Sequence, residues 1–484
     1  MISKPANSGI NMNRDDGAKL MNSSFKGVDQ FREVYFIGIG GIGMSAIARF
    51  FHSKGVTVSG YDKTPTTLTK ELEASGIAVH YEEDLDIIPK DADLVVYTPA
   101  IPKDHAALRY YQEHGKKVVK RSDVLQLITE SSFNICIAGT HGKTTITTMV
   151  AHLLRDSGFG CNAFLGGISV NYGTNFWSDP RNVCVIEADE YDRSFLKLSP
   201  NVAIVTAMDA DHLDIYGTAA AVEQAFIDFS ARVRPGGILI RQFGLRRGRD
   251  LQADQVLTYS LQNETAAVHA ANIRMMNGSY EFDVVMNDNR IDKVVLHMGG
   301  MHNVENVLAA IAAASSLGID NDRIKSAVES FRGVKRRFEY LIKTDRLVFI
   351  DDYAHHPEEL RALINGARAL FRQRKCAVIF QPHLYSRTRD FADGFAEALD
   401  LADEVILLPV YPARELPIAG VESEIIASKM KHARVSIKTK EEVVAWINKE
   451  YKTSINDEFG NILVTGGAGD IDTLVQPIKK LLSE

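Results

Sequence analysis

Hydrophobic residues along this chain gather into short runs that alternate with longer stretches of helical periodicity. The first block has four such runs, at residues 34–39, 56–60, 94–97 and 117–119. Strands that alternate with helices in this way are typical of an α/β fold with a parallel sheet. The pattern therefore predicts an α/β domain at the start of the ordered chain.

The alternation continues in a second, longer block. Its apolar runs lie at residues 133–138, 183–186, 202–205 and 237–240. Residues 272–298 have the pattern of hairpins that turn at Asn277-Gly278 and at Asn287-Asp288, because Asn-Gly pairs favour tight two-residue turns. A helical pattern over residues 304–317 closes this block.

A third block has apolar runs at residues 347–350, 376–380, 404–408 and 462–464. A chain of 484 residues with 45% hydrophobic content can bury several cores. We therefore predict three α/β domains after a disordered leader. The expected boundaries are 1–30 for the leader and 31–131, 132–335 and 336–484 for the domains.

Composition and charge argue against some classes of binding partner. The net charge of −7 gives no electrostatic footprint for nucleic acid, and no apolar run reaches transmembrane length. The four cysteines lie far apart and form no C-x-x-C pair, which favours reduced thiols and a cytoplasmic location. We thus expect no nucleic acid and no membrane insertion. Translation could start at Met1, Met12 or Met21, and both a monomer and a homodimer stay open.

The most informative motif follows the apolar run 133–138. It consists of Gly139, Thr140, His141, Gly142, Lys143, Thr144 and Thr145. A strand, a glycine turn and a helix start form a phosphate cradle, in which Lys143 reaches the phosphates and Thr144 can bind Mg²⁺. Only the second half of the general phosphate-loop motif is present, but its strand and helix context predicts that the protein uses ATP.

A second glycine-rich turn follows the apolar run 34–39. Its glycines are Gly38, Gly40, Gly41 and Gly43, and Asp62 ends the next predicted strand. This arrangement is typical of a Rossmann-like site for a diphosphate. The rest of that ligand could be NAD, FAD or a nucleotide sugar.

Acidic side chains follow two strands of the second block. Glu187, Asp189 and Glu190 come after one strand, and Asp211 and His212 come after the next. Oxygen ligands suit Mg²⁺, and a neutral imidazole can join them. A solvated acidic loop is the alternative for either cluster alone.

In the third block, polar residues follow two further strands. Asp352, Tyr353, His355 and His356 follow one strand, and His383 lies in the segment after the next, together with Arg387. We expect these residues to line one crevice at the carboxyl edge of a sheet. A zinc site would need a third ligand at metal spacing, and the sequence offers no convincing one.

Taken in order, these motifs resemble the Mur ligase family of peptidoglycan synthesis, from Phe31 to the end of the chain. Further matches are His302-Asn303-Val304-Glu305-Asn306, Arg336-Arg337-Phe338 and Gln381-Pro382-His383. The resemblance implies an N-terminal Rossmann-like domain, a central P-loop ATPase-like domain and a C-terminal Rossmann-like domain. Within the family, the motifs are most similar to those of members that join L-alanine to UDP-N-acetylmuramate through an acyl phosphate.

The resemblance also implies roles for individual residues, and closure of the domains that assembles the site. The implied catalytic residues are Lys143, Glu187, His212 and Arg337. The implied ATP contacts are Gly139, Thr140, His141, Gly142, Lys143, Thr144, Thr145, Asn303, Asn306, Arg337 and Asp352. Mg²⁺ would be bound by Thr144, Glu187 and His212, and the UDP-sugar by Gly38, Gly40, Gly41, Gly43 and Asp62. The amino acid would meet Tyr353, His355, His383 and Arg387.

Two departures from the family pattern affect these assignments. No lysine lies in residues 215–229, where related ligases carry a carbamylated lysine, and Leu384 stands where many L-alanine ligases have arginine. Arg387 is the expected substitute. A ligase that attaches a preformed tripeptide to the same sugar nucleotide shares nearly all of the motifs. An NAD-dependent oxidoreductase built on residues 38–43 is an alternative from another class, but it leaves the phosphate loop and both metal-type clusters unexplained. A regulatory nucleotide-binding module without chemistry is a third alternative.

Overall fold

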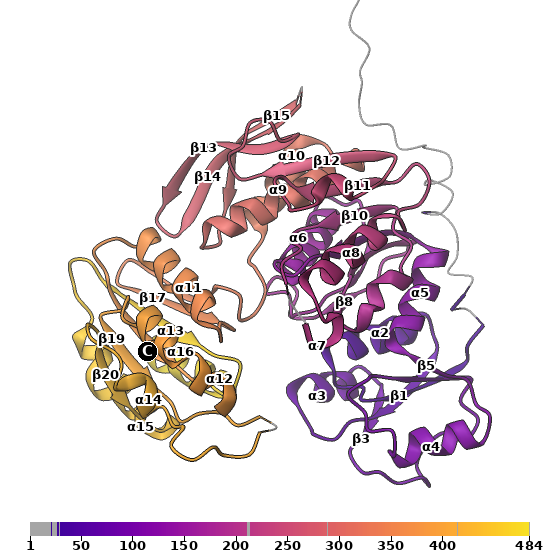
Figure 1. The fold of residues 1–484 in the computed structure, drawn as a ribbon, viewed down its shortest axis with the longest axis horizontal. Coiled ribbons are helices and arrows are strands. Elements are labelled where there is room, and N and C mark those ends of the chain that lie inside the picture. Colours follow the sequence, from indigo (N-terminus) through magenta and orange to yellow (C-terminus); the bar gives the residue numbers. More distant parts are fainter. Residues whose placement is uncertain are drawn as a thin grey trace, which may run out of the picture. The chain divides into compact units, whose positions relative to one another are not determined.

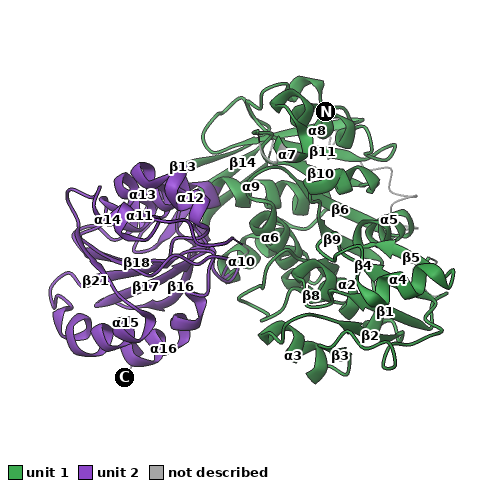
Figure 2. Ribbon diagram, turned by 60° about the horizontal axis from the view of Figure 1, so that its bottom comes forward, with its two compact units in different colours: residues 1–271, 283–294, 305–331 green, residues 272–282, 295–304, 332–484 purple. Residues whose placement is uncertain are grey.

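A computed structural model gives the fold of this protein. It describes residues 21, 27–28, 30–210, 213–287, 289–413 and 415–483. The chain forms two compact units, which Figure 2 shows in green and purple. Unit 1 consists of residues 1–271, 283–294 and 305–331, and unit 2 of residues 272–282, 295–304 and 332–484.

Most of the predicted leader lies outside the described residues. Of its described residues, Val28 is buried in the core of unit 1, and the Met21 carbonyl accepts a hydrogen bond from the Asn182 amide at 3.0 Å. The four boundaries predicted from the sequence stay a prediction.

The N-terminal sheet has five parallel strands in the order β3-β2-β1-β4-β5, of which Figure 1 labels β1, β3 and β5. The strands are β1 Glu33–Ile37, β2 Thr57–Tyr61, β3 Ala78–His80, β4 Leu94–Tyr97 and β5 Val118–Lys120. The helices are α2 Ile42–Ser53, α3 Thr67–Ala74, α4 Ala106–Glu113 and α5 Arg121–Ser131. This order places β1 at the centre and confirms the predicted α/β fold.

The central sheet has ten strands in the order β15-β14-β13-β12-β11-β10-β6-β9-β7-β8. The strands are β6 Phe133–Ala138, β7 Asn162–Phe164, β8 Phe176–Trp177, β9 Val183–Glu187, β10 Val202–Val205, β11 Ile238–Gln242, β12 Gln255–Ser260, β13 Val268–Met276, β14 Ser279–Met286 and β15 Asn289–Leu296. The helices are α6 Lys143–Asp156, α7 Leu213–Tyr216, α8 Ala219–Ser230, α9 Met301–Ser316 and α10 Asn321–Ser330.

The predicted hairpins are present at the edge of this sheet. Strands β13 and β14 are separated by Asn277 and Gly278, whose φ angles are 37° and 78°. Left-handed backbone at both turn residues matches the right-handed twist of the strands, which explains the Asn-Gly pair. Asn287, at φ 45°, begins the next turn, and Asp288 lies outside the described residues.

The C-terminal sheet has six strands in the order β16-β17-β21-β18-β19-β20, with only β16 antiparallel to its neighbour. The strands are β16 Glu339–Lys343, β17 Leu347–Asp352, β18 Lys375–Phe380, β19 Glu404–Leu407, β20 Arg434–Ile437 and β21 Asn461–Gly466. The helices are α11 Pro357–Leu370, α12 Tyr385–Asp390, α13 Ala392–Leu399, α14 Glu424–Ala427, α15 Lys440–Trp446 and α16 Asp472–Ser483.

The core of unit 1 continues from the N-terminal sheet to the central sheet. Val34 and Phe36 face this shared core, whereas Tyr35 faces a smaller cluster on the other side of β1, as alternation along a strand requires. Phe50 of α2 packs edge-on against Phe164, with ring centres 5.2 Å apart. The first two predicted domains are therefore joined by apolar packing. Among the described residues, no helix is long and apolar enough to cross a membrane.

Candidate active site

The glycine turn after β6 leads directly into α6, which begins at Lys143. Gly139 and Gly142 have φ angles of 137° and 78°, a region of backbone conformation that favours glycine. A β-carbon on Gly139 would lie 1.9 Å from Thr206 Oγ1. No side chain caps α6 at Gly142, so the amides of its first turn are available to an anion.

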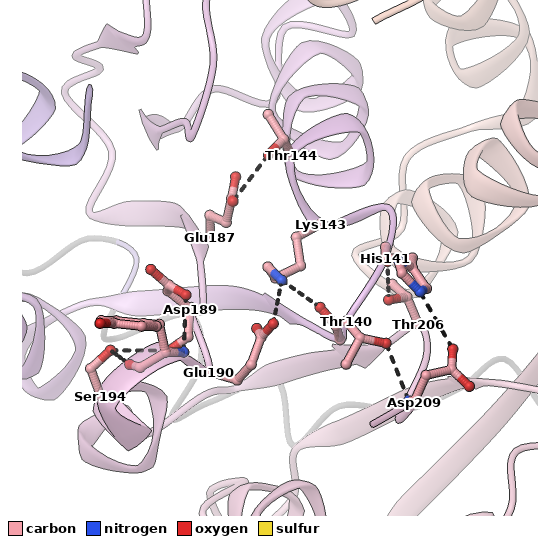
Figure 3. A network of polar contacts seen from close by, with 12 residues as sticks. Thr140, His141, Lys143, Thr144, Glu187, Asp189, Glu190, Ser194, Thr206 and Asp209 are labelled. Carbon is pink, nitrogen blue, oxygen red and sulfur yellow. Dashed lines mark hydrogen bonds and ion pairs between the residues drawn. The ribbon is translucent and has the colours of Figure 1, made fainter. Parts of the chain in front are cut away.

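Lys143 lies between the turn and the acidic segment after β9. Its Nζ donates to the Gly139 carbonyl and to Glu190 Oε1, each at 2.7 Å (Figure 3). The Glu190 side chain is only 1% exposed. Sequence reasoning included Glu190 in the acidic cluster but did not identify it as the partner of this lysine.

Glu187 and Thr144 form a second contact between the same two segments (Figure 3). Thr144 Oγ1 donates to Glu187 Oε1 at 3.0 Å, and the Gly166 amide donates to Oε2 at 3.1 Å. Burial raises the pKa of Glu187, although Lys143 and both hydrogen bonds act in the opposite direction. A carboxylate and a hydroxyl, both oxygen donors, fit Mg²⁺, whose charge would offset the desolvation of the carboxylate.

The third predicted metal ligand, His212, lies outside the described residues, as does Asp211. Within the described part of the chain, no group of three His, Cys, Asp or Glu side chains is arranged to hold a metal ion. The local evidence for Mg²⁺ is therefore the pair formed by Thr144 and Glu187.

The remaining residues of the turn contact the segment after β10. The Asp209 amide donates to Thr140 Oγ1 at 3.2 Å, and His141 Nε2 lies 3.6 Å from Asp209 Oδ2 (Figure 3). The His141 and Asp209 side chains are largely exposed, whereas Thr145 is buried. This side of the turn thus presents an exposed imidazole.

Asn303 and Asn306 lie one turn apart on α9. A β-carbon on Gly142 would lie 2.9 Å from Asn306 Oδ1, so Asn306 reaches the phosphate turn. Asn303 is buried, and its Nδ2 donates to the Gly299 carbonyl at 2.7 Å. The structure therefore places the Asn306 side chain beside the phosphate turn.

The other glycine turn, between β1 and α2, is held by its own neighbours. The amides of Gly38 and Ile39 donate to the Tyr61 carbonyl at 2.8 and 2.9 Å. The Gly40 amide donates to Asp62 Oδ2 at 2.7 Å. Asp62 thus supports the shape of the turn, and its contact with the UDP-sugar stays a prediction.

In unit 2, Arg337 comes shortly before β16, and Asp352 is the last residue of β17. The Arg337 guanidinium lies 5.8 Å from the centre of the Tyr353 ring. Both Asp352 oxygens accept backbone hydrogen bonds, from Phe338 at 2.6 Å and from Ala354 at 2.7 Å. Burial raises the pKa of Asp352 to about 6.

The four predicted amino-acid contacts lie close together in unit 2. The His355 ring lies 5.3 Å from that of Tyr353 and 6.3 Å from that of His383. Burial lowers the pKa of His355, and the charge of Arg387 adds to this effect. Leu384 adopts a φ of 69°, an uncommon conformation for leucine, and begins the helix that carries Arg387.

The neighbouring His356 has a structural contact. Its Nδ1 accepts a hydrogen bond from the Glu358 amide, and its own amide donates to Glu359, so it caps α11.

Family models match three consecutive parts of the chain. "Mur ligase family, catalytic domain" matches residues 33–132, "Mur ligase middle domain" matches residues 137–314, and "Mur ligase, glutamate ligase domain" matches residues 336–469.

Curated relatives match nearly the whole chain. The UDP-N-acetylmuramate–L-alanine ligases of Flavobacterium johnsoniae and Phocaeicola vulgatus are 46% and 47% identical, each over 94% of this chain and 99% of its own length. The structure of the UDP-N-acetylmuramate-alanine ligase of Thermotoga maritima has a TM-score of 0.76 at 30% identity, covering 93% of this chain and 98% of that one. A murein peptide ligase of Psychrobacter arcticus shares the fold, with a TM-score of 0.64 at 23% identity. That match covers 94% of this chain and 99% of the other.

Proposed function

This chain belongs to the Mur ligase family, and we propose that it joins L-alanine to the lactyl carboxylate of UDP-N-acetylmuramate in an ATP-dependent reaction. The products are UDP-N-acetylmuramoyl-L-alanine, ADP and phosphate, and the first of these is a peptidoglycan precursor. The observation that carries the proposal is the phosphate turn with Lys143 and Thr144 at the start of α6, in a chain about 46% identical to curated L-alanine ligases.

The chemistry explains why ATP is needed. A carboxylate is a poor acylating agent, because oxide would have to leave from its carbon. Attack of a carboxylate oxygen on the γ-phosphorus forms an acyl phosphate and releases ADP. The amine of L-alanine then attacks the acyl carbon, inorganic phosphate leaves with the bridging oxygen, and the amine loses a proton to solvent.

Lys143 is proposed to neutralise charge on the transferred phosphoryl group. Its Nζ lies beside the turn, and two protein oxygens at 2.7 Å fix its position. Thr144 and Glu187 would bind one Mg²⁺, and His212 together with Glu187 would bind a second. Bound Mg²⁺ supplies charge stabilisation at the phosphate oxygens. Catalysis of this kind depends mainly on positioning and on electrostatic stabilisation.

The other residue roles are also proposals. The turn residues Gly139 to Thr145 and Asn306, all in unit 1, are assigned to ATP, as is Asn303, which belongs to unit 2. Arg337 and Asp352 are assigned to ATP from unit 2. Tyr353, His355, His383 and Arg387 are assigned to L-alanine, and their close spacing supports a shared site.

The location and oligomeric state are further proposals. All four cysteines are buried and unpaired, which is compatible with a reducing cytoplasm. The proposed partners are the two small-molecule substrates, with no nucleic acid and no membrane insertion, for either a monomer or a homodimer.

Amino-acid-dependent phosphate release tests this function. The protein is mixed with Mg-ATP and UDP-N-acetylmuramate, and L-alanine is compared with an L-alanyl tripeptide. We expect release that depends on both substrates and is faster with L-alanine. A preference for the tripeptide would instead identify a recycling ligase. Formation of NADH from NAD⁺ with candidate alcohols, and no phosphate release, would identify an oxidoreductase.

A further inference from the structure

Arg121 lies at the carboxyl edge of the N-terminal sheet, where α5 begins directly after β5. The glycine turn between β1 and α2 opens at the same edge, because all five strands are parallel. Ligands of open α/β sheets bind outside this edge. Arg121 therefore lies on the side of the sheet where a sugar nucleotide would bind.

The guanidinium of Arg121 packs directly on the last glycine of the turn. A β-carbon on Gly43 would lie 2.2 Å from Arg121 Nη1 and 3.3 Å from both Cδ and Cζ. Any side chain at position 43 would displace the arginine. Glycine at this position thus makes room for a cation at the start of α2.

A cation at this place is electrostatically unfavourable in the absence of an anion. The first turn of α2 carries the positive end of the helix dipole, and no side chain caps it at Gly41. The amides of Gly38, Ile39 and Gly40 are already bonded within the protein. The positive end of the α2 dipole and the guanidinium charge of Arg121 thus lie next to each other at the first turn of α2.

Asp189 forms an ion pair with Arg121 through one of the two terminal nitrogens of the guanidinium. Arg121 Nη2 lies 3.2 Å from Asp189 Oδ2, and the two side chains are 28% and 37% exposed. Asp189 belongs to the segment that also carries Glu187 and Glu190. The ion pair holds the guanidinium over the turn through Nη2, and Nη1 is the atom that lies against Gly43.

We propose that Arg121 binds the diphosphate of the sugar nucleotide, together with the amides of the first turn of α2. This inference rests on the proposed function and adds a residue that the glycine motif does not contain. A diphosphate satisfies both positive features, because its oxygens accept hydrogen bonds from backbone amides and from a guanidinium.

The test measures dissociation constants by isothermal titration calorimetry on the whole protein. Arg121→Gln removes the charge, and Arg109→Gln is the matched control, since Arg109 is an exposed arginine of α4 paired with Glu113. We expect Arg121→Gln to weaken UDP-N-acetylmuramate binding about 10- to 100-fold, the scale of charge-assisted hydrogen bonds. Arg109→Gln should change the dissociation constant for UDP-N-acetylmuramate less than twofold. The dissociation constants of the parent and both variants for a non-hydrolysable ATP analogue should agree within twofold.

Asp189→Asn separates ligand binding from a purely structural ion pair. It removes the partner of Arg121 and leaves the guanidinium in place, so we expect UDP-N-acetylmuramate to bind equally well or more tightly. Equal weakening by Asp189→Asn and Arg121→Gln would overturn the proposal, as would a change below twofold in folded Arg121→Gln.

Two further outcomes are interpretable. If Arg121→Gln does not fold, Arg121→Lys replaces it, with an expected weakening of about 3- to 30-fold because the two-pronged geometry is lost; an unchanged affinity overturns the inference. A parent protein that binds the ATP analogue but no UDP-N-acetylmuramate contradicts the proposed function itself, and the inference with it.

Discussion

Lys143 and Glu190 form a buried ion pair of 2.7 Å at the phosphate turn. The lysine side chain is 15% exposed and that of the glutamate 1%. Both belong to unit 1, although one starts α6 and the other follows β9. The lysine expected to meet the phosphates is thus already held by a carboxylate.

Because of this ion pair, we expect a bound nucleotide to stabilise a Glu190 variant against unfolding more than it stabilises the parent. Glu190→Gln keeps the shape of the side chain but removes the carboxylate that forms the ion pair with the largely buried Lys143 ammonium, so we expect a loss of about 3 kcal/mol in the free energy of unfolding. Phosphates then supply the missing charge. Thermal unfolding with and without an ATP analogue should show a larger stabilisation in the variant than in the parent. Equal stabilisation of the two proteins would contradict this role.

Glu187→Gln tests the proposed metal ligand. The amide keeps the hydrogen bond to Thr144 but loses the charge that attracts Mg²⁺. We expect the half-saturating Mg²⁺ concentration for phosphate release to rise at least about tenfold, the scale on which groups that tune a metal site act. Glu130→Gln, on the exposed face of α5, is the matched control. An unchanged Mg²⁺ titration would indicate that Glu187 only supports the Gly166 loop.

Asp351 predicts a pH dependence of stability. Burial raises its pKa from 3.8 to about 7, although Arg336 at 3.2 Å opposes the shift. Between pH 4 and 7 the folded protein therefore retains a proton that the unfolded chain has lost, so this contribution to stability falls as pH rises. Asp352 acts in the same direction.

Asp351→Asn removes the titrating group and should flatten the curve. Urea unfolding of parent and variant at pH 5, 6, 7 and 8 measures the slope in this window. The same slope in both proteins would show that Asp351 is ionised throughout.

A contact could be predicted from the sequence when it joins residues that lie close together along the chain. The phosphate turn was predictable, because Gly139, Gly142 and Lys143 lie within one turn and follow an apolar strand. Asn277-Gly278 likewise predicted its hairpin. Strand β16 was not predicted, since it is a short edge strand with Glu339 and Lys343 at its ends.

Contacts between distant segments were not predictable in the same way. Glu190 meets Lys143 because β6 and β9 pair in parallel, which brings the segments after the two strands to the same edge of the sheet. Arg121 meets Gly43 only once the parallel sheet brings the ends of β1 and β5 to one edge. Neither contact can be predicted from residue types and their spacing along the chain.

The position of the Tyr353 ring predicts that this residue limits the size of the amino acid that the enzyme accepts. Its ring is 36% exposed and lies beside His355 and the guanidinium of Arg337, so it can form one wall of the amino-acid site. We expect Tyr353→Ala to raise kcat/KM for L-valine relative to L-alanine by about 10-fold, the scale of one or two methylene groups. Steady-state kinetics with L-alanine, L-valine and an L-alanyl tripeptide measures the change. Equal selectivity in both proteins would leave Tyr353 a packing residue.

The central claim is that ATP activates the lactyl carboxylate as an acyl phosphate. The most direct measurement uses UDP-N-acetylmuramate labelled with ¹⁸O in that carboxylate, and follows the label in the released phosphate by mass spectrometry. The oxygen that attacks the γ-phosphorus leaves with phosphate when L-alanine displaces it. The account therefore predicts one labelled oxygen in each phosphate formed with a molecule of amide product. Unlabelled phosphate accompanying amide formation would contradict it.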